Sequence, residues 1–239
     1  RQSRTFIPTT REVPSSAEAT SHKLLIKAGM VKQVSAGVYT HLPLATKVIQ
    51  KIEKVIREEH EKIGAVELLM PILQSDEYWK KSGRWYKMGD ELMRVTDRKG
   101  AAYALSPTAE ELICQAVNNM ITSYKQLPVN LFQFQTKFRD EIRPRLGLLR
   151  TKEFIMKDAY TFDESPEGMR KSYNEYYQAY SNIFDRFGLK YRAVKADSGN
   201  IGGSYTHEFQ ALAEVGEDTI VYTEESDYAA NIETAAVVE

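Results

Sequence analysis

The sequence predicts an α+β fold in which an antiparallel β-sheet is flanked by helices. Three observations support this prediction. Strand-like segments follow one another through short turns, and helical segments separate groups of strands. Residues 129–142 alternate strictly between apolar and polar side chains, which is typical of a strand with two different faces. Neither a G-x-G-x-x-G sequence after a strand nor a P-loop sequence occurs, so a doubly wound nucleotide-binding fold is disfavoured.

Local signals define the expected elements in chain order. The expected helices cover residues 16–28, 44–63, 75–83, 108–121 and 166–187. The expected strands cover residues 38–42, 65–70, 92–96, 101–105, 129–142, 149–160, 191–196, 209–215 and 219–223.

Most expected helices have a recognisable start or stop. The helix over 44–63 has apolar side chains near i, i+4 spacing, and Gly64 lies at its stop position. Ser75 is a suitable N-cap for the next helix. Ser165 is an N-cap followed by Pro166 at the first helical position. The aromatic side chains of that last helix recur at helical spacing and are expected to pack in the core.

The strands are bounded by turn residues. The apolar segment 65–70 leads directly into Pro71, and residues 97–100 form a turn signal between two short strands. In residues 129–142, three phenylalanines point one way, and glutamine and charged side chains point the other way. Because a turn signal at 144–147 follows, we expect residues 149–160 to return as the partner strand.

Composition limits the class of protein. The chain has 239 residues, of which 42% are apolar and 27% are charged, so it can bury a large core. No run of about 18 uncharged apolar residues occurs, and we therefore expect no membrane span. Because the chain has one cysteine, Cys114, it cannot form an intramolecular disulfide, and we expect a reducing, cytoplasmic location. The apolar neighbours of Cys114 predict that it lies in the core. His22, His41, His60 and His207 lack the spacing of zinc ligands, so no metal site is predicted.

The formal net charge of −1 hides an uneven distribution. Residues 196–239 contain ten acidic residues and no lysine or arginine, which leaves 32 basic and 23 acidic residues in 1–195. The resulting net charge of +9 is compatible with a polyanionic partner such as a nucleic acid or a nucleotide. A solvated surface of mixed charge explains the composition equally well, so both interpretations stay open at this point.

Basic side chains gather around the end of the predicted hairpin. Six basic and two acidic residues lie here: Lys137, Arg139, Arg143, Arg145, Arg150, Lys152, Asp140 and Glu141. If the strands pair, Arg139 and Arg150 converge on one anion, and two guanidinium groups suit phosphate oxygens. Glu141 is placed to order these arginines or to accept from an amino group, and Phe154 is placed to stack on a planar base. A surface ion-pair cluster on an edge strand is the alternative.

A second candidate cluster covers residues 106–111. Thr108 and Glu111 have the spacing of a capping box, which explains both residues without a ligand. Glu110 remains in the first helical turn, where the helix dipole also favours a carboxylate. A binding role requires Glu110 to point into a pocket and to meet a cation.

Together these motifs resemble class II aminoacyl-tRNA synthetases, and within that class the bacterial-type prolyl family. Residues 138–141, followed by Arg150-x-x-Glu153-Phe154, resemble the second signature motif of the class. Thr108-Ala109-Glu110 resembles the T-x-E element of the prolyl enzymes. Further matching segments cover residues 123–128, 135–144, 156–160 and 204–209.

The resemblance implies ATP-dependent activation of proline and transfer of the prolyl group to tRNA(Pro), with Mg²⁺ bound together with ATP. By this resemblance Arg139 is the catalytic residue, because it holds both the ATP α-phosphate and the proline carboxylate. Glu141 contacts the adenine side, Arg150 binds the bent triphosphate, and Phe154 stacks on adenine. Pro71, with the helix before it, resembles the first motif, which builds the homodimer interface in this class.

The proline pocket and the domain boundaries are also implied by the resemblance. Thr108 and Glu110 receive the imino group of proline, and His207 lines the pocket. We expect a catalytic domain over 1–223, with 224–239 as the start of an editing insertion or a truncated linker. The third motif of the family and its anticodon-binding domain are absent from the sequence, so we expect this chain alone to be weak or inactive. The alternative is a non-catalytic module that binds tRNA or a regulatory partner.

Overall fold

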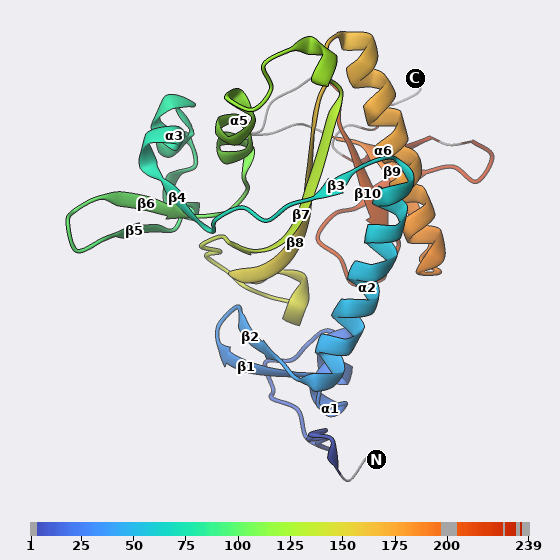
Figure 1. The fold of residues 1–239 in the computed structure, drawn as a ribbon. Coiled ribbons are helices and arrows are strands. Elements are labelled where there is room, and N and C mark those ends of the chain that lie inside the picture. The colour runs from blue at the N-terminus through green and yellow to red at the C-terminus, as the bar shows by residue number, and fades with distance from the viewer. Residues whose placement is uncertain (1–3, 197–204, 227, 233–234, 236–239) are drawn as a thin grey trace. The chain divides into compact units, whose positions relative to one another are not determined.

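The computed structural model describes residues 4–196, 205–226, 228–232 and 235. The chain divides into two compact units, Arg1–Tyr173 and Asn174–Glu239. Each unit combines helices with small, mainly antiparallel sheets (Figure 1). The predicted α+β class is therefore confirmed, although the strands of the described residues form four sheets instead of one.

The first unit begins with one helix and one antiparallel hairpin, α1 (Thr20–Lys27), β1 (Val31–Ser35) and β2 (Val38–His41). Gly37 in the hairpin turn has a φ of +74°, and a Cβ atom there would lie 2.8 Å from Pro144. Gly147 has a φ of +66°, and its Cβ atom would lie 2.7 Å from the His22 ring. The N-terminal elements therefore lie directly against the loop that carries the basic cluster.

Helix α2 (Pro43–Lys62) is the predicted amphipathic helix, with proline at its start. It packs against strand β7 (Val129–Phe138). The Arg57 guanidinium lies 4.5 Å from the centre of the Phe134 ring, and the His60 ring lies 4.9 Å from the Phe132 ring. The Arg57 and His60 side chains of this helix thus contact the face of β7 that carries Phe132 and Phe134.

The strand predicted over 65–70 is much shorter than expected. Strand β3 (Val66–Glu67) pairs in parallel with β7, and the pairing then ends. One more backbone bond follows, from the Leu68 amide to the Phe132 carbonyl at 2.9 Å, and side chains then bind the Met70 backbone. The Met70 amide donates to Gln133 Oε1 at 3.0 Å, and Gln135 Nε2 donates to the Met70 carbonyl. Because these glutamines satisfy the backbone, no further ladder is needed here.

A small antiparallel sheet with the order β4-β6-β5 follows. Its strands and nearby helices are β4 (Leu73–Ser75), α3 (Asp76–Lys81), α4 (Arg84–Lys87), η2 (Gly89–Glu91), β5 (Arg94–Thr96) and β6 (Ala102–Leu105). Trp79, Leu92 and Ala104 form its core. Both the predicted hairpin and the Ser75 cap are confirmed, since the Ser75 hydroxyl accepts from the Glu77 amide.

Helix α5 (Glu110–Asn118) contradicts two expectations. Its N-cap is Ala109, without a side-chain cap, so the capping box predicted from Thr108 and Glu111 is wrong. The Thr108 hydroxyl instead donates to Glu110, and Glu111 binds Arg84. Cys114 is exposed, and not in the core as predicted, because the helix buries its Ile113 and Val117 face.

In the central hairpin, β7 pairs with β8 (Glu153–Phe162) over ten residue pairs. The short helix η3 (Tyr124–Gln126) precedes β7, and η4 (Gly147–Leu149) precedes β8. The predicted alternation is confirmed. The polar face is nevertheless deeply buried, and Gln133 and Lys137 are both 0% exposed. Hydrogen bonds from this face to Met70 and to Ser106 show that the neighbouring loops cover it.

The second unit contains most of α6 (Pro166–Arg186) and a sheet with the order β10-β9-β12-β11. Its strands are β9 (Tyr191–Lys195), β10 (His207–Ala211), β11 (Ile220–Tyr222) and β12 (Ala229–Asn231). The Phe209 ring contacts Tyr177, Tyr180 and Phe184 of the helix, with ring centres 5.0–5.8 Å apart. The aromatic side chains of α6 therefore pack as predicted. The glycine-rich residues 199–203 lie outside the described part of the chain.

No helix in the described residues combines the length and the apolar character needed to cross a membrane.

Candidate active site

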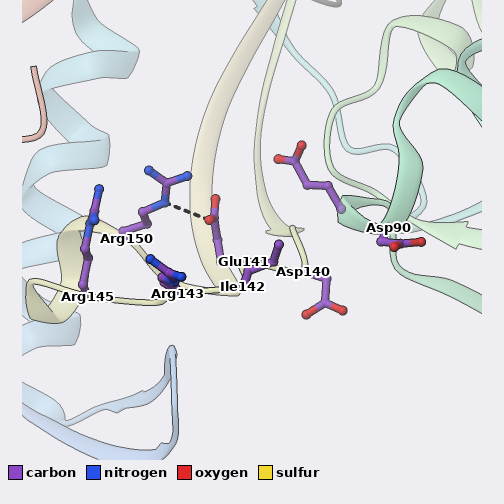
Figure 2. A pocket seen from close by; sticks show the side chains of 8 residues that line it. Asp90, Asp140, Glu141, Ile142, Arg143, Arg145 and Arg150 are labelled. Atoms are coloured by element: carbon purple, nitrogen blue, oxygen red, sulfur yellow. Dashed lines mark hydrogen bonds and ion pairs between the residues drawn. The ribbon is translucent and has the colours of Figure 1, made fainter.

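Three of the six clustered basic residues, Arg143, Arg145 and Arg150, line an open cavity at the tip of the β7–β8 hairpin, whereas Lys137, Arg139 and Lys152 do not line it. The cavity has a volume of about 690 Å³ and is lined by Asp90, Glu91, Asp140, Glu141, Ile142, Arg143, Arg145 and Arg150. Figure 2 shows the three arginines gathered on one side of Glu141 and the carboxylates of Asp90 and Asp140 on the other. Such a cavity offers guanidinium groups to the phosphates of a nucleotide.

Glu141 orders one of these arginines. The Arg150 Nε atom lies 2.8 Å from Glu141 Oε2, and this ion pair crosses the hairpin loop (Figure 2). Lys152 forms a second ion pair with Asp140 at 2.6 Å. The predicted ordering of arginines by Glu141 therefore has a structural basis at Arg150.

Arg139 points to a different neighbour. Its Nη2 atom donates to the Pro107 carbonyl at 3.4 Å, and its guanidinium lies 5.5 Å from the centre of the Phe154 ring. The structure thus places Arg139 at the turn before α5 and beside the ring that was expected to stack on adenine. The convergence of Arg139 with Arg150 on one anion stays a prediction.

Thr108 and Glu110 are in direct contact. The Thr108 hydroxyl lies 2.7 Å from both carboxylate oxygens of Glu110, so it donates to that carboxylate. The Phe138 amide donates to the Ser106 carbonyl at 3.0 Å, which fixes the end of β7 beside this turn. A carboxylate at Glu110 and a guanidinium at Arg139 therefore flank one turn, an arrangement suited to the two charged ends of a free amino acid.

Arg84 is a member of the site that the sequence did not reveal. Its Nη1 atom lies 3.1 Å from Glu110 and 3.0 Å from Glu111, so one guanidinium joins the two carboxylates. The guanidinium also lies 5.1 Å from the centre of the Trp79 ring, and the side chain is only 12% exposed. Glu110 does meet a cation, as a binding role required, but that cation belongs to the protein.

A buried polar network lies beneath the turn. Lys137 Nζ donates to Gln135 Oε1 at 2.8 Å and to Asp158 Oδ2 at 3.1 Å. Burial lowers the pKa of Lys137, and the charge of Asp158 acts in the opposite direction. Tyr160 donates to the same carboxylate oxygen at 2.5 Å, and burial raises the pKa of this phenol. The sequence showed the alternation of β7, but it did not show that Lys137 would be buried.

The remaining predicted residues lie elsewhere. His207 lies on β10 in the second unit, where its ring lies 5.6 Å from Tyr177 in an edge-on arrangement. Pro71 lies between β3 and β4 in the first unit. The roles predicted for both residues stay predictions. In the described part of the chain, no group of three or more His, Cys, Asp or Glu side chains is placed to hold a metal ion.

Comparison with known proteins identifies a family to which this chain is similar. Residues 92–237 match the family model described as tRNA synthetase class II core domain (G, H, P, S and T). The chain is 60% identical to the proline–tRNA ligases of Macrococcus caseolyticus and Staphylococcus epidermidis, and 59% identical to that of Staphylococcus aureus. Each alignment covers all of this chain and 42% of the relative, so the chain spans about two-fifths of their length.

Solved structures show the same fold. The prolyl-tRNA synthetase of Cryptosporidium parvum, complexed with L-proline and AMP, matches 78% of this chain and 38% of its own with a TM-score of 0.69. The same enzyme complexed with halofuginone and AMPPNP matches with a TM-score of 0.70. Sequence identity is 18% in both cases, so this likeness concerns the fold.

Proposed function

The chain belongs to the family of class II tRNA synthetase core domains, and we propose that it forms part of the catalytic domain of a proline–tRNA ligase. In this proposal the full-length protein activates proline with ATP and transfers the prolyl group to the 3′ end of tRNA(Pro). The observation that carries the proposal is the turn at Pro107–Glu110, with a carboxylate on one side and the Arg139 guanidinium on the other. The 60% identity to proline–tRNA ligases supports the choice of amino acid.

Each side chain has a role in the proposed reaction. Glu110 and the Thr108 hydroxyl bind the protonated imino nitrogen of proline, while Arg139 binds its carboxylate. The carboxylate then attacks the α-phosphorus of ATP in line, which forms prolyl-adenylate and releases pyrophosphate. No side-chain nucleophile is needed, because positioning and charge stabilisation by Arg139 lower the barrier. His207 is proposed to line the proline pocket.

ATP is proposed to occupy the cavity at the hairpin tip. At this cavity Arg150 binds the phosphates and Glu141 contacts the adenine side. Phe154 does not line the cavity but lies beside Arg139, and it is proposed to stack on the base. The ion pair between Arg150 and Glu141 supports this role, because it holds the guanidinium at the cavity before the nucleotide arrives. Mg²⁺ is proposed to bind together with ATP and would neutralise the charge of the phosphates. In keeping with the absence of a suitable group of His, Cys, Asp or Glu side chains in the described residues, no protein ligands are proposed for it.

We also propose a cytoplasmic homodimer with Pro71 at its interface. Large apolar side chains flank this residue and are exposed, with Val66 62%, Leu69 76% and Leu73 48% exposed. Val48 and Ile52 on α2 are exposed as well. Apolar side chains of this kind suit burial against a second subunit. The assignment of 224–239 to an editing insertion or linker remains a proposal about domain organisation.

Pyrophosphate exchange tests the proposed function. The full-length protein that contains this chain should exchange pyrophosphate into ATP when proline is present, whereas exchange with threonine or glycine instead would point to a sister enzyme. Arg139→Ala should lower the rate about 10²–10³-fold, because it removes one charge-stabilising donor. Arg98→Ala, in the exposed turn between β5 and β6, is the matched control. A near-normal rate for Arg139→Ala would contradict its role.

A non-catalytic module that binds tRNA or a regulatory partner is the second candidate. Its support is the net charge of +9 over residues 1–195, which suits a polyanion without requiring catalysis. Calorimetry of the full-length protein with a prolyl-adenylate analogue separates the two candidates. Binding of the analogue supports the ligase, and binding of tRNA alone supports the module.

A further inference from the structure

The turn that carries Thr108 and Glu110 is held on one side by the Ser106 hydroxyl and on the other by the Tyr160 hydroxyl. On one side, the Ser106 hydroxyl and Gln74 Nε2 both donate to the Thr108 carbonyl at 3.1 Å. On the other side, the Ala109 amide donates to the Tyr160 hydroxyl at 3.1 Å. Ser106 is 0% exposed, so water does not replace its bond to the Thr108 carbonyl.

A buried ion pair fixes the direction of these hydrogen bonds. Lys137 Nζ lies 3.4 Å from the Ser106 oxygen, and an ammonium group can only donate. Gln74 Nε2, a donor as well, lies 3.0 Å from the same oxygen. The Ser106 hydrogen must therefore point to the Thr108 carbonyl.

The same reasoning applies to Tyr160. The carboxylate of Asp158 can only accept, so the Tyr160 hydrogen points to Asp158 Oδ2, and a lone pair is left for the Ala109 amide. Gln133 and Lys137 donate to this same oxygen at 2.9 and 3.1 Å. Among the described residues, Lys137 is the cation that pairs with Asp158.

We propose that the Lys137–Asp158 pair is a positioning device for substrate, which acts through Ser106 and Tyr160 to hold Thr108 and Glu110 in the orientation that binds the nitrogen of the amino acid. This inference rests on the proposed function. The pair itself does not touch substrate, so these four side chains are positioning residues and not catalytic ones. Loss of the device loosens the turn and weakens amino-acid binding, and ATP binding at the hairpin tip is unaffected.

Tyr160→Phe in the full-length protein is the first test. It removes one hydroxyl and leaves the Ala109 amide without its acceptor. We expect KM for proline to rise about tenfold, which corresponds to about 1.4 kcal/mol, with kcat and KM for ATP changed less than twofold. Tyr103→Phe is the matched control, because the Tyr103 hydroxyl on β6 makes no hydrogen bond within the described residues.

Replacement of the pair by apolar residues is the second test. Lys137→Met combined with Asp158→Leu removes both charges together, so that no unpaired charge is left buried. Because Gln133, Gln135 and Tyr160 each lose a partner, we expect the thermal midpoint to fall, and at a temperature at which the variant is folded we expect KM for proline to rise about tenfold. A purely structural pair would leave KM unchanged once the fold is intact. If this double variant does not fold, Tyr160→Phe decides alone.

Two results would overturn the inference. One is a KM for proline within twofold of the unmodified protein in Tyr160→Phe. The other is an equal rise in KM for ATP, which would indicate a general loss of structure. Absence of proline-dependent exchange in the unmodified protein would instead refute the proposed function, so the two failures are distinguishable.

Discussion

Gly147→Ala tests whether α1 supports the loop that carries the arginines. The φ of +66° at Gly147 costs an alanine about 1–2 kcal/mol. The added Cβ would also lie 2.7, 2.8 and 2.9 Å from Cγ, Cβ and Cδ2 of His22. Because overpacking of this kind costs about 1–3 kcal/mol, we expect the free energy of unfolding to fall by about 2–5 kcal/mol. Urea unfolding of the full-length protein, followed by circular dichroism, measures this loss.

Gly100→Ala is the matched control for this experiment. Gly100 also has a positive φ, +86°, but nothing lies within 4 Å of the added Cβ. It should therefore lose only the backbone term of about 1–2 kcal/mol. Gly147→Ala should additionally raise KM for ATP, since its loop leads into Arg150 at the cavity. Equal losses of stability in the two variants would refute the packing argument.

Two further predictions concern Arg84 and His60. Arg84→Met should raise KM for proline about 10–100-fold in the exchange assay, because Glu110 loses a charged partner and remains beside Glu111. Glu111→Gln keeps the ion pair between Arg84 and Glu110, so this control should change KM for proline far less. Burial and the nearby Lys157 lower the pKa of His60 from 6.5 to about 4. Between pH 6.5 and pH 4 the unfolded chain therefore binds a proton at His60 that the folded chain does not bind. As the pH falls from above 6.5 to 4, the free energy of unfolding therefore decreases by about 3 kcal/mol. Urea unfolding between pH 7 and pH 4 measures this slope, and His60→Gln should flatten it; an unchanged slope in that variant would contradict the assignment to His60.

Elements with strong local signals could be predicted from the sequence. The amphipathic helix before Gly64 appears where its pattern places it. The two hairpin strands also pair as predicted, but the first ends at Phe138 and not at residue 142, and the second begins at Glu153 and not at residue 149. Local periodicity reports which face of an element is apolar, and this was sufficient for these features.

Contacts between distant residues could not be predicted. The capping box failed because Arg84, 27 residues before Glu111, binds that carboxylate. The strand over 65–70 was shortened because side chains of β7 bind the Met70 backbone. Strand β12 was missed because Ala229–Asn231 lacks the β-branched and aromatic residues that mark a strand. A pattern within one segment contains no information about the partner that a buried polar group will find.

The turn at Thr108–Glu110 and the side chains that hold it lie far apart along the chain, which affects folding during synthesis on the ribosome. The Ala109 amide receives its partner from Tyr160, 51 residues later, and Met70 receives its partner from Gln133, 63 residues later. At about 5–20 residues per second, a ribosome needs roughly 3–10 s to add the 51 residues after Ala109. During that interval the nascent chain contains Thr108 and Glu110 but no rigid site. In the proposed function, the site for proline would therefore be complete only after β8 has paired with β7.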